Sequence, residues 1–271
     1  MEQEKKLVKK VRRLLRRLKC PRWLHHFGPK TYELADHIFG LLVRAFCKLS
    51  YERTVELLTL LGIMCPSKSA LQYNAAKLDT KFWTRVLRAT SGIAYLVALD
   101  STGFSRTNPS YHYLRRIDGK IPKVPVKMSV AFDTRKKRFC AARIRVLPAH
   151  DVRDAPVLLK KTLPTVAVAD KAYDSERLYE LSYEQETLLV VPPRRNVRKG
   201  FFRKKAQRKF NLRTYHRREL VESGFSSIKR KYGSSVSSRS VRTIRTELYS
   251  RLACHNIFLW LQRLLGQSPL L

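Results

Sequence analysis

The sequence predicts an α/β protein in which a mixed β-sheet, with helices packed on it, follows a helical N-terminal region. Apolar residues recur at helical spacing through much of the first ninety residues. Beyond Ser91-Gly92, short apolar or alternating runs typical of strands appear, with helical segments between them. Strands that alternate with helices imply a mixed sheet. We therefore divide the chain into a helical region at 1–90, a sheet domain at 91–240 and a C-terminal helix at 241–271 that packs on the sheet domain.

The first predicted helix, at 5–19, is amphipathic and strongly basic. Its apolar stripe consists of Leu7, Val11, Leu14 and Leu18. The other faces carry Lys and Arg, which is typical of a solvated basic helix or of a helix that lies along phosphates. A membrane surface is a further partner for such a helix, and the rest of the chain favours it less. Cys20-Pro21 ends the helix, because the residue before proline avoids the helical region.

Further helices are predicted at 31–48, 50–62 and 68–78. Ser50 and Ser67 are suitable N-caps for the last two, and Gly62 is suited to a helix end. Two helices joined by a short connector are typical of a helix-turn-helix DNA reader and equally of an ordinary helical hairpin. If the segment reads DNA, its exposed polar candidates are Gln72, Asn74 and Lys77.

The sheet domain begins with an apolar run at 93–99 that ends at Asp100. The runs at 127–134 and 138–148 alternate on either side of a basic turn and predict a hairpin. A helix capped by Asp154 follows at 155–163, and Pro164 ends it. A buried strand at 165–170, a helix at 175–186 and a strand at 187–192 complete the alternation.

The charge balance indicates a polyanionic partner. Lys and Arg number 56 against 21 acids, giving a net charge of +35, while an apolar fraction of 44% is enough for a core. A chain that is basic for solubility or heat tolerance would carry acids in similar numbers as ion pairs. Nucleic acid is the favoured partner, because each neutralised phosphate releases counterions.

The five cysteines are scattered and form no CxxC pair, so neither a zinc site nor a disulfide framework is indicated. This pattern is typical of a reducing, intracellular compartment. The charged N-terminus does not resemble a signal peptide, and the apolar run at 253–261 is too short to span a bilayer. We expect no membrane association.

A basic segment at 194–218 holds twelve Lys or Arg, no acid and four interleaved aromatic residues. A charge run is usually a solvated loop, but rings that stack on bases and cations that meet phosphates favour a nucleic-acid contact. The residues predicted to contact DNA are Arg203, Lys204, Lys205, Arg208 and Lys209.

Two acids, Asp100 and Asp170, each follow a predicted strand. Phosphodiester transfer commonly uses two divalent cations about 4 Å apart, and magnesium prefers carboxylate oxygens. If the two strands are parallel neighbours, both carboxylates emerge at one edge of the sheet. Asp is also common at strand ends for its turn preference, so the position alone is weak evidence.

The third acid, Glu222, lies in a predicted helix with Tyr215, Arg218 and Lys229. At about 100° per residue these four residues fall within an arc of roughly 60° on one helix face. A carboxylate between cations suits a metal ligand bordered by phosphate-binding groups, whereas a surface helix with an i,i+4 ion pair from Arg218 to Glu222 explains the same pattern. Gly224 costs this helix about 1 kcal/mol relative to alanine, which favours close packing or a less regular helix at that point.

At these residues the sequence resembles the DDE transposases of bacterial and archaeal insertion sequences, in the superfamily that includes insertion-sequence families four and five. Their pattern Y-x2-R-x3-E-x6-K is matched at Tyr215, Arg218, Glu222 and Lys229. The segments VALDSTGFS (97–105) and VADKAYDS (168–175) are similar to the strands that carry the first and second aspartates of the family. The resemblance covers roughly 95–235, with motif spacings of 70 and 52 residues.

The resemblance implies an RNase H-like catalytic domain at 91–240 and two Mg²⁺, for which Mn²⁺ can substitute. In this interpretation Asp100 contacts both ions, Asp170 and Glu222 each complete one, and Tyr215, Arg218 and Lys229 position phosphates. Asp174 is the nearest rival to Asp170. Other acids are less well placed, namely Asp118, Asp133, Asp151 and Asp154.

We therefore expect a DNA transposase that cleaves element ends and attacks target DNA with the freed 3′-hydroxyl. Its partners are double-stranded DNA at the element ends and at the target, and a homodimer is expected because two ends must be brought together. The expected location is the cytoplasm, in association with the nucleoid. Two alternatives remain: an RNase H-like nuclease without strand transfer, and a non-catalytic DNA-binding protein derived from a transposase.

Overall fold

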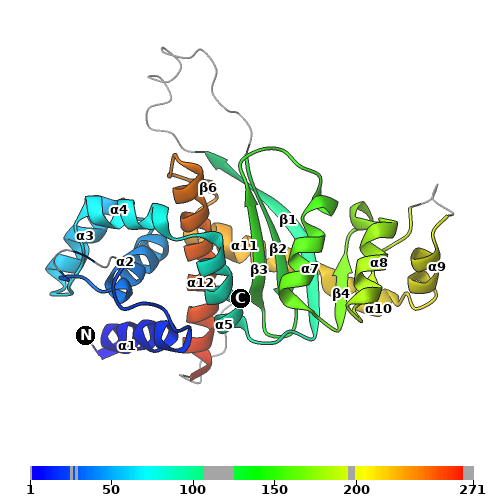
Figure 1. The fold of residues 1–271 in the computed structure, drawn as a ribbon, viewed down its shortest axis with the longest axis horizontal. Helices are drawn as coiled ribbons and strands as arrows, with labels where there is room; N and C mark the ends of the chain where they lie inside the picture. The colour runs from blue at the N-terminus through cyan, green and yellow to red at the C-terminus, as the bar shows by residue number, and fades with distance from the viewer. Residues whose placement is uncertain (1, 25–26, 28–29, 107–124, 195–198, 265–271) are drawn as a thin grey trace, which may run out of the picture.

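The computed structural model describes residues 2–24, 27, 30–106, 125–194 and 199–264, with side chains described at 8–259 of these. It has a helical N-terminal part and a sheet with helices on both faces, as Figure 1 shows. The expected α/β architecture with a mixed sheet is confirmed.

The sheet has the strand order β3-β2-β1-β4-β5. Strands β1 (Leu96–Arg106), β2 (Val126–Asp133) and β3 (Arg138–Arg145) are antiparallel neighbours. Strands β4 (Val166–Ala169) and β5 (Leu188–Val190) add to the other side of β1 in parallel. The short β6 (Ser235–Val236) pairs with the far end of β1. The predicted hairpin and both later strands are thus present.

Strand β1 is longer than the apolar run that predicted it. Its ladder with β2 continues from Val97↔Asp133 to Phe104↔Val126, so Asp100 lies within the strand and the expectation of a strand-end position was wrong. Hydrogen bonding in a sheet uses the backbone, so polar side chains extend a strand when a partner strand is available. β4 does end directly before Asp170.

Helices α7 (Ala155–Thr162) and α8 (Glu176–Glu184) pack on one face of the sheet, together with α9 (Phe201–Gln207). The other face packs against α5 (Thr80–Ser91), α11 (Leu220–Tyr232) and α12 (Val241–Leu264). In Figure 1, α7 lies in front of the sheet and α11 behind it. The two faces bury separate apolar clusters because side chains alternate along each strand.

The N-terminal part consists of α1 (Glu2–Arg17), α2 (Leu34–Cys47), α3 (Tyr51–Leu60) and α4 (Lys68–Lys77). Ser50 and Ser67 accept hydrogen bonds from the backbone amides of Arg53 and Ala70, as expected of N-caps. Helix α5 was not predicted from the sequence, although Asp79 caps it by accepting from the amide of Phe82 at 2.7 Å.

The C-terminal helix α12 lies between the N-terminal helices and the sheet (Figure 1), and contacts α2, α4, α5 and β3. Its buried Leu248, Leu252 and Ala253 belong to the same apolar cluster as Val11 of α1 and Phe104 of β1. The N-terminal helices therefore share one core with this face of the sheet. None of the helices described is long and apolar enough to cross a membrane.

Candidate active site

Asp100 lies in β1, and Asp170 directly follows β4, the parallel neighbour of β1. The register pairs Leu99 of β1 with Ala169 of β4. Asp100 directly follows Leu99, and Asp170 directly follows Ala169. Ala98 and Val168, two residues before the aspartates, belong to the apolar cluster on the α11 face. Because side chains alternate, Asp100 and Asp170 are directed to that same face. Both are only partly exposed, and each accepts a hydrogen bond from the next backbone amide.

Glu222 reaches this face from the first turn of α11. The expectation that Tyr215, Arg218, Glu222 and Lys229 share a single helix was wrong. Tyr215 ends the short α10 (Leu212–Tyr215), and a 3₁₀ turn at His216–Glu219 precedes α11. Of the two alternatives for Gly224, close packing is present, because a Cβ there would lie 2.9 Å from the ring of Phe132 on β2. Only glycine allows α11 to approach the sheet this closely, and the approach sets the position of Glu222.

Arg218 connects two of the three acids. Its Nη2 lies 2.8 Å from Glu222 Oε1, and its Nη1 lies 3.5 Å from Asp100 Oδ2. Burial raises the pKa of Asp100 above its ordinary value, and the carboxylates of Glu222 and Asp151 add to the rise. The Ser101 amide and the Arg218 guanidinium act in the opposite direction. Arg218 therefore offsets the repulsion between acids that share this site.

Tyr173 has a buried hydroxyl close enough to the site for its carboxylates to raise the pKa of the phenol. It lies in the 3₁₀ turn η2 (Lys171–Tyr173) directly after Asp170, and is buried. Burial raises its pKa, as do the nearby carboxylates of Asp151, Asp100 and Asp170 among others, so the phenol stays protonated. Its Oη has no hydrogen-bond partner among the described residues. A buried polar atom without a partner marks a place where a further group is needed.

These residues suit a hard divalent cation by their chemistry. The candidate donors are carboxylate oxygens, which Mg²⁺ prefers. In this structure the guanidinium of Arg218 is the positive group that contacts Asp100 and Glu222. In the described part of the chain, no three His, Cys, Asp or Glu side chains form a ready-made metal site.

Most rival acids have structural partners. Asp174 is buried against Arg203, with Nε 2.7 Å from its Oδ1. Asp133 accepts from two amides of the β2–β3 turn. Asp154 does not cap α7 as expected, because its carboxylate accepts from Ser129 and Arg145 instead. Asp118 lies outside the described residues.

Asp151 lies close to the candidate site, although its sequence position did not predict this. It is in the 3₁₀ turn η1 (Asp151–Arg153), contacts Lys127, and accepts a hydrogen bond of 2.6 Å from Ser101 Oγ. It contributes to the raised pKa values of both Asp100 and Tyr173. In the sequence, candidate acids were chosen because they follow predicted strands, and Asp151 does not follow one. The fold nevertheless places it next to Ser101, the neighbour of Asp100.

The basic segment contains α9, and most of the cations predicted to contact DNA are exposed there. Arg203 is the exception and a correction: it is buried, pairs with Asp174, and donates to the Lys199 carbonyl. A guanidinium held inside the protein is not presented to DNA. The exposed members are Lys204, Lys205, Arg208 and Lys209. Tyr215 and Lys229 are half-buried, with the Lys229 Nζ 5.5 Å from the Phe104 ring centroid.

In the helical region, α3 and α4 contact each other and form a helix pair joined by residues 61–67. Gln72 and Lys77 are exposed on α4. Asn74 is not exposed as expected: it is half-buried, and its amide lies 3.2–3.3 Å from the ring nitrogens of His37 on α2.

Comparisons with known proteins show the family to which the chain belongs. A family model described as a transposase DDE domain matches residues 92–257, so the chain belongs to the DDE transposase domain family. The comparison with curated proteins found no match. One similar solved structure is the cryo-EM structure of a piggyBac transposase synaptic complex with hairpin DNA, at 14% identity and a TM-score of 0.50. The match covers 97% of this chain and 74% of that one, and confirms an RNase H-like fold.

Proposed function

We propose that this protein is a DNA transposase in which Asp100, Asp170 and Glu222 hold two Mg²⁺, or Mn²⁺ in their place, to cleave element ends and join them to target DNA. The observation that carries the proposal is the register Leu99↔Ala169, which makes the two aspartates neighbours on the face that α11 covers. Arg218, in contact with both Asp100 and Glu222, supports including the glutamate.

When bound, the metal ions supply positive charge that stabilises the entering and leaving oxygens of an in-line displacement. The chain's own groups have other tasks. The three carboxylates would hold the ions relative to the sheet. Arg218, which lies between two acids, is placed to bind a phosphate once those acids take up metal. Tyr215 and Lys229 are proposed to position the flanking phosphates.

Several exposed groups are proposed to bind the DNA away from the cleaved bond. On α9 and the residues after it these are Lys204, Lys205, Arg208 and Lys209, and on α4 they are Gln72 and Lys77. The partners are double-stranded element ends and target DNA. A homodimer, and a location in the cytoplasm with the nucleoid, follow from the need to bring two ends together on chromosomal DNA and belong to this proposal.

The test is cleavage and strand transfer on duplexes made from the DNA that flanks the gene, with Mg²⁺ and with EDTA. Wild type is expected to nick and join only with the metal, and Glu222→Gln to do neither. Glu180→Gln, an exposed acid on α8 across the sheet, is the matched control and keeps full activity. Nicking without joining would identify a nuclease, and binding without nicking would identify a non-catalytic DNA-binding protein.

A further inference from the structure

A cavity of about 490 Å³ lies between the N-terminal helices and the segment that links β6 to α12. Three cations line it, Arg44 at the end of α2, Lys48 after it, and Arg239 of the linking segment. The other lining residues are Gln72, Leu49 and six residues with hydroxyl side chains. The described lining contains no acid. Cations and neutral hydrogen-bond donors without acids form a surface suited to an anion.

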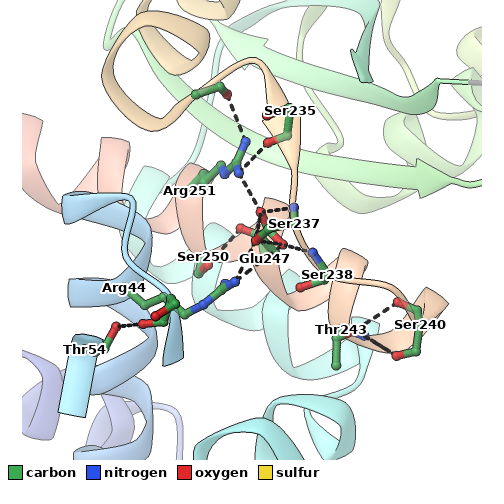
Figure 2. A network of polar contacts seen from close by, with 12 residues as sticks. Arg44, Thr54, Ser235, Ser237, Ser238, Ser240, Thr243, Glu247, Ser250 and Arg251 are labelled. Carbon is green, nitrogen blue, oxygen red and sulfur yellow. Dashed lines mark hydrogen bonds and ion pairs between the residues drawn. The ribbon is translucent and has the colours of Figure 1, made fainter. Parts of the chain in front are cut away.

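Behind the lining residues Arg44, Ser237 and Ser238 lies a buried network with a surplus of positive charge. Figure 2 shows Arg44 and Arg251 on opposite sides of Glu247, and all three side chains are more than nine-tenths buried. Glu247 accepts from the backbone amides of Ser237 and Ser238 at 3.1 and 2.9 Å. It also pairs with the Arg251 Nη2 at 2.6 Å. Although burial raises the pKa of Glu247, Arg44 and Arg251 lower it overall, so the carboxylate is charged.

Arg44 is therefore the cation that lacks a full partner. Its Nη2 lies 3.8 Å from Glu247, beyond hydrogen-bond distance, and donates instead to Ser237 Oγ at 2.9 Å. Its guanidinium carbon lies 4.2 Å from the Tyr51 ring centroid. Its Nε is buried and has no hydrogen-bond partner among the described residues. A buried guanidinium with an open donor is stabilised by an anion that approaches from the cavity.

We propose that this cavity, the Arg44 pocket, binds a backbone phosphate of the DNA held at the candidate active site. The proposal rests on the proposed function. The pocket lies between the two regions that are proposed to contact DNA, α4 and the candidate active site. Gln72 of α4 lines it, and β6, which directly precedes its linking segment, pairs with β1, the strand that carries Asp100. Val236 pairs with Arg106, six residues after Asp100. At ~3.3 Å per residue the pocket begins about 20 Å from Asp100, roughly six base pairs of DNA at ~3.4 Å each.

DNA is the favoured source of the phosphate. The pocket opens at a surface on which Lys48 and Arg239 are exposed, and it lies on the sheet face that Asp100 and Glu222 share. A duplex that extends from the acids toward α4 would pass over it. One buried guanidinium with surrounding hydroxyls would then fix the register of that duplex without reading its sequence.

The test uses the double variant Lys48→Gln/Arg239→Gln, which removes the exposed cations and leaves the buried network intact. Affinity for a 30-base-pair mixed-sequence duplex is measured against salt in EDTA. The slope of log affinity against log salt should fall by about 2, at ~0.9 for each lost phosphate contact. The matched control is Lys160→Gln/Arg177→Gln, two exposed cations on α7 and α8 across the sheet, and its slope should equal that of wild type.

A slope that falls no further than in the control would overturn the Arg44 pocket as a DNA site while leaving the transposase proposal standing. Failure of wild type to bind the duplex at all would overturn both. Calorimetry with inorganic phosphate alone distinguishes binding of free phosphate from binding of DNA. Saturable phosphate binding, together with a salt slope of duplex binding that the double variant leaves unchanged, would assign the pocket to free phosphate and overturn the DNA proposal. Arg44→Lys, checked for folding by thermal unfolding, keeps the charge but loses the Nε donor, and should weaken duplex binding without changing its salt slope.

Discussion

Gly224→Ala tests whether close packing of α11 on the sheet sets the position of Glu222. The new Cβ would lie 2.9, 3.1 and 3.3 Å from three carbons of the Phe132 ring. Carbon atoms in contact prefer about 3.5–4.0 Å, so the helix or the ring must move by about 0.5–1 Å. Phe132 is 1% exposed, and its centroid lies 4.9 Å from that of Phe139, so the ring has little room to move. The helix is the element that shifts.

Two effects of the substitution oppose each other. Removing a glycine from a helix interior gains about 1 kcal/mol, whereas overpacking a core costs about 1–3 kcal/mol. The overpacking cost exceeds the gain, so we expect a net loss of about 1 kcal/mol and a decrease of a few degrees in melting temperature. The larger effect is on cleavage, because a shift of about 1 Å at a reacting group can cost about a hundredfold in rate.

The assays are urea unfolding and metal-dependent nicking of flanking-sequence duplexes. Ser226→Ala, at an exposed position of the same helix, is the control and should change neither result. Phe132→Leu combined with Gly224→Ala should recover part of the lost stability, since it makes room for the methyl group. If Gly224→Ala raises stability by about 1 kcal/mol, as at an open helical site, the packing argument is wrong.

Three further outcomes are expected. Asp100→Asn should abolish cleavage and leave DNA binding equal or tighter, because it removes a carboxylate beside phosphates; cleavage at the wild-type rate would exclude this site. Replacing the exposed cations of the α9 region with glutamine should reduce the salt slope of duplex binding by about 3–4, and an unchanged slope would mean that they only face solvent. The residues changed are Lys204, Lys205, Arg208 and Lys209. Burial lowers the pKa of His255 from 6.5 to about 4, so the unfolded chain takes up this proton first as pH falls. Stability is therefore complete above pH 6.5 and declines by up to about 3 kcal/mol toward pH 4, and His255→Gln should flatten this part of the urea-unfolding profile.

The elements with strong local signals were the ones that the sequence predicted. Alternation fixed the β2–β3 hairpin, and the serine caps marked the starts of α3 and α4 within one residue. The helix α5 was missed even though Asp79 caps it. The polar half of β1 was missed for a different reason: Ser101 and Thr102 are in a strand because β2 offers a backbone to pair with, which is a property of the fold rather than of those residues.

The candidate site shows the same division. The chemical types and spacing of Asp100, Asp170 and Glu222 were visible in the sequence, and Gly224 predicted either close packing or a less regular helix. Two features depended on contacts between distant segments. Asp174 follows Asp170 by only four residues in the sequence, and what distinguishes the two is the burial of Asp174 against Arg203. Asp151 approaches Ser101 from 50 residues away.

The position of Arg218 ties the electrostatics of the site to its proposed chemistry. Several carboxylates on one half-buried face repel one another, and the raised pKa of Asp100, caused first by burial, reflects the cost of charging it there. The Arg218 guanidinium, which contacts both Asp100 and Glu222, offsets part of this cost. A divalent cation held by the same oxygens would replace that contribution, and Arg218 would then be free to bind an anion. The group suited to receive it is a DNA phosphate, so one side chain can stabilise the acids before DNA binds and grip the substrate afterwards.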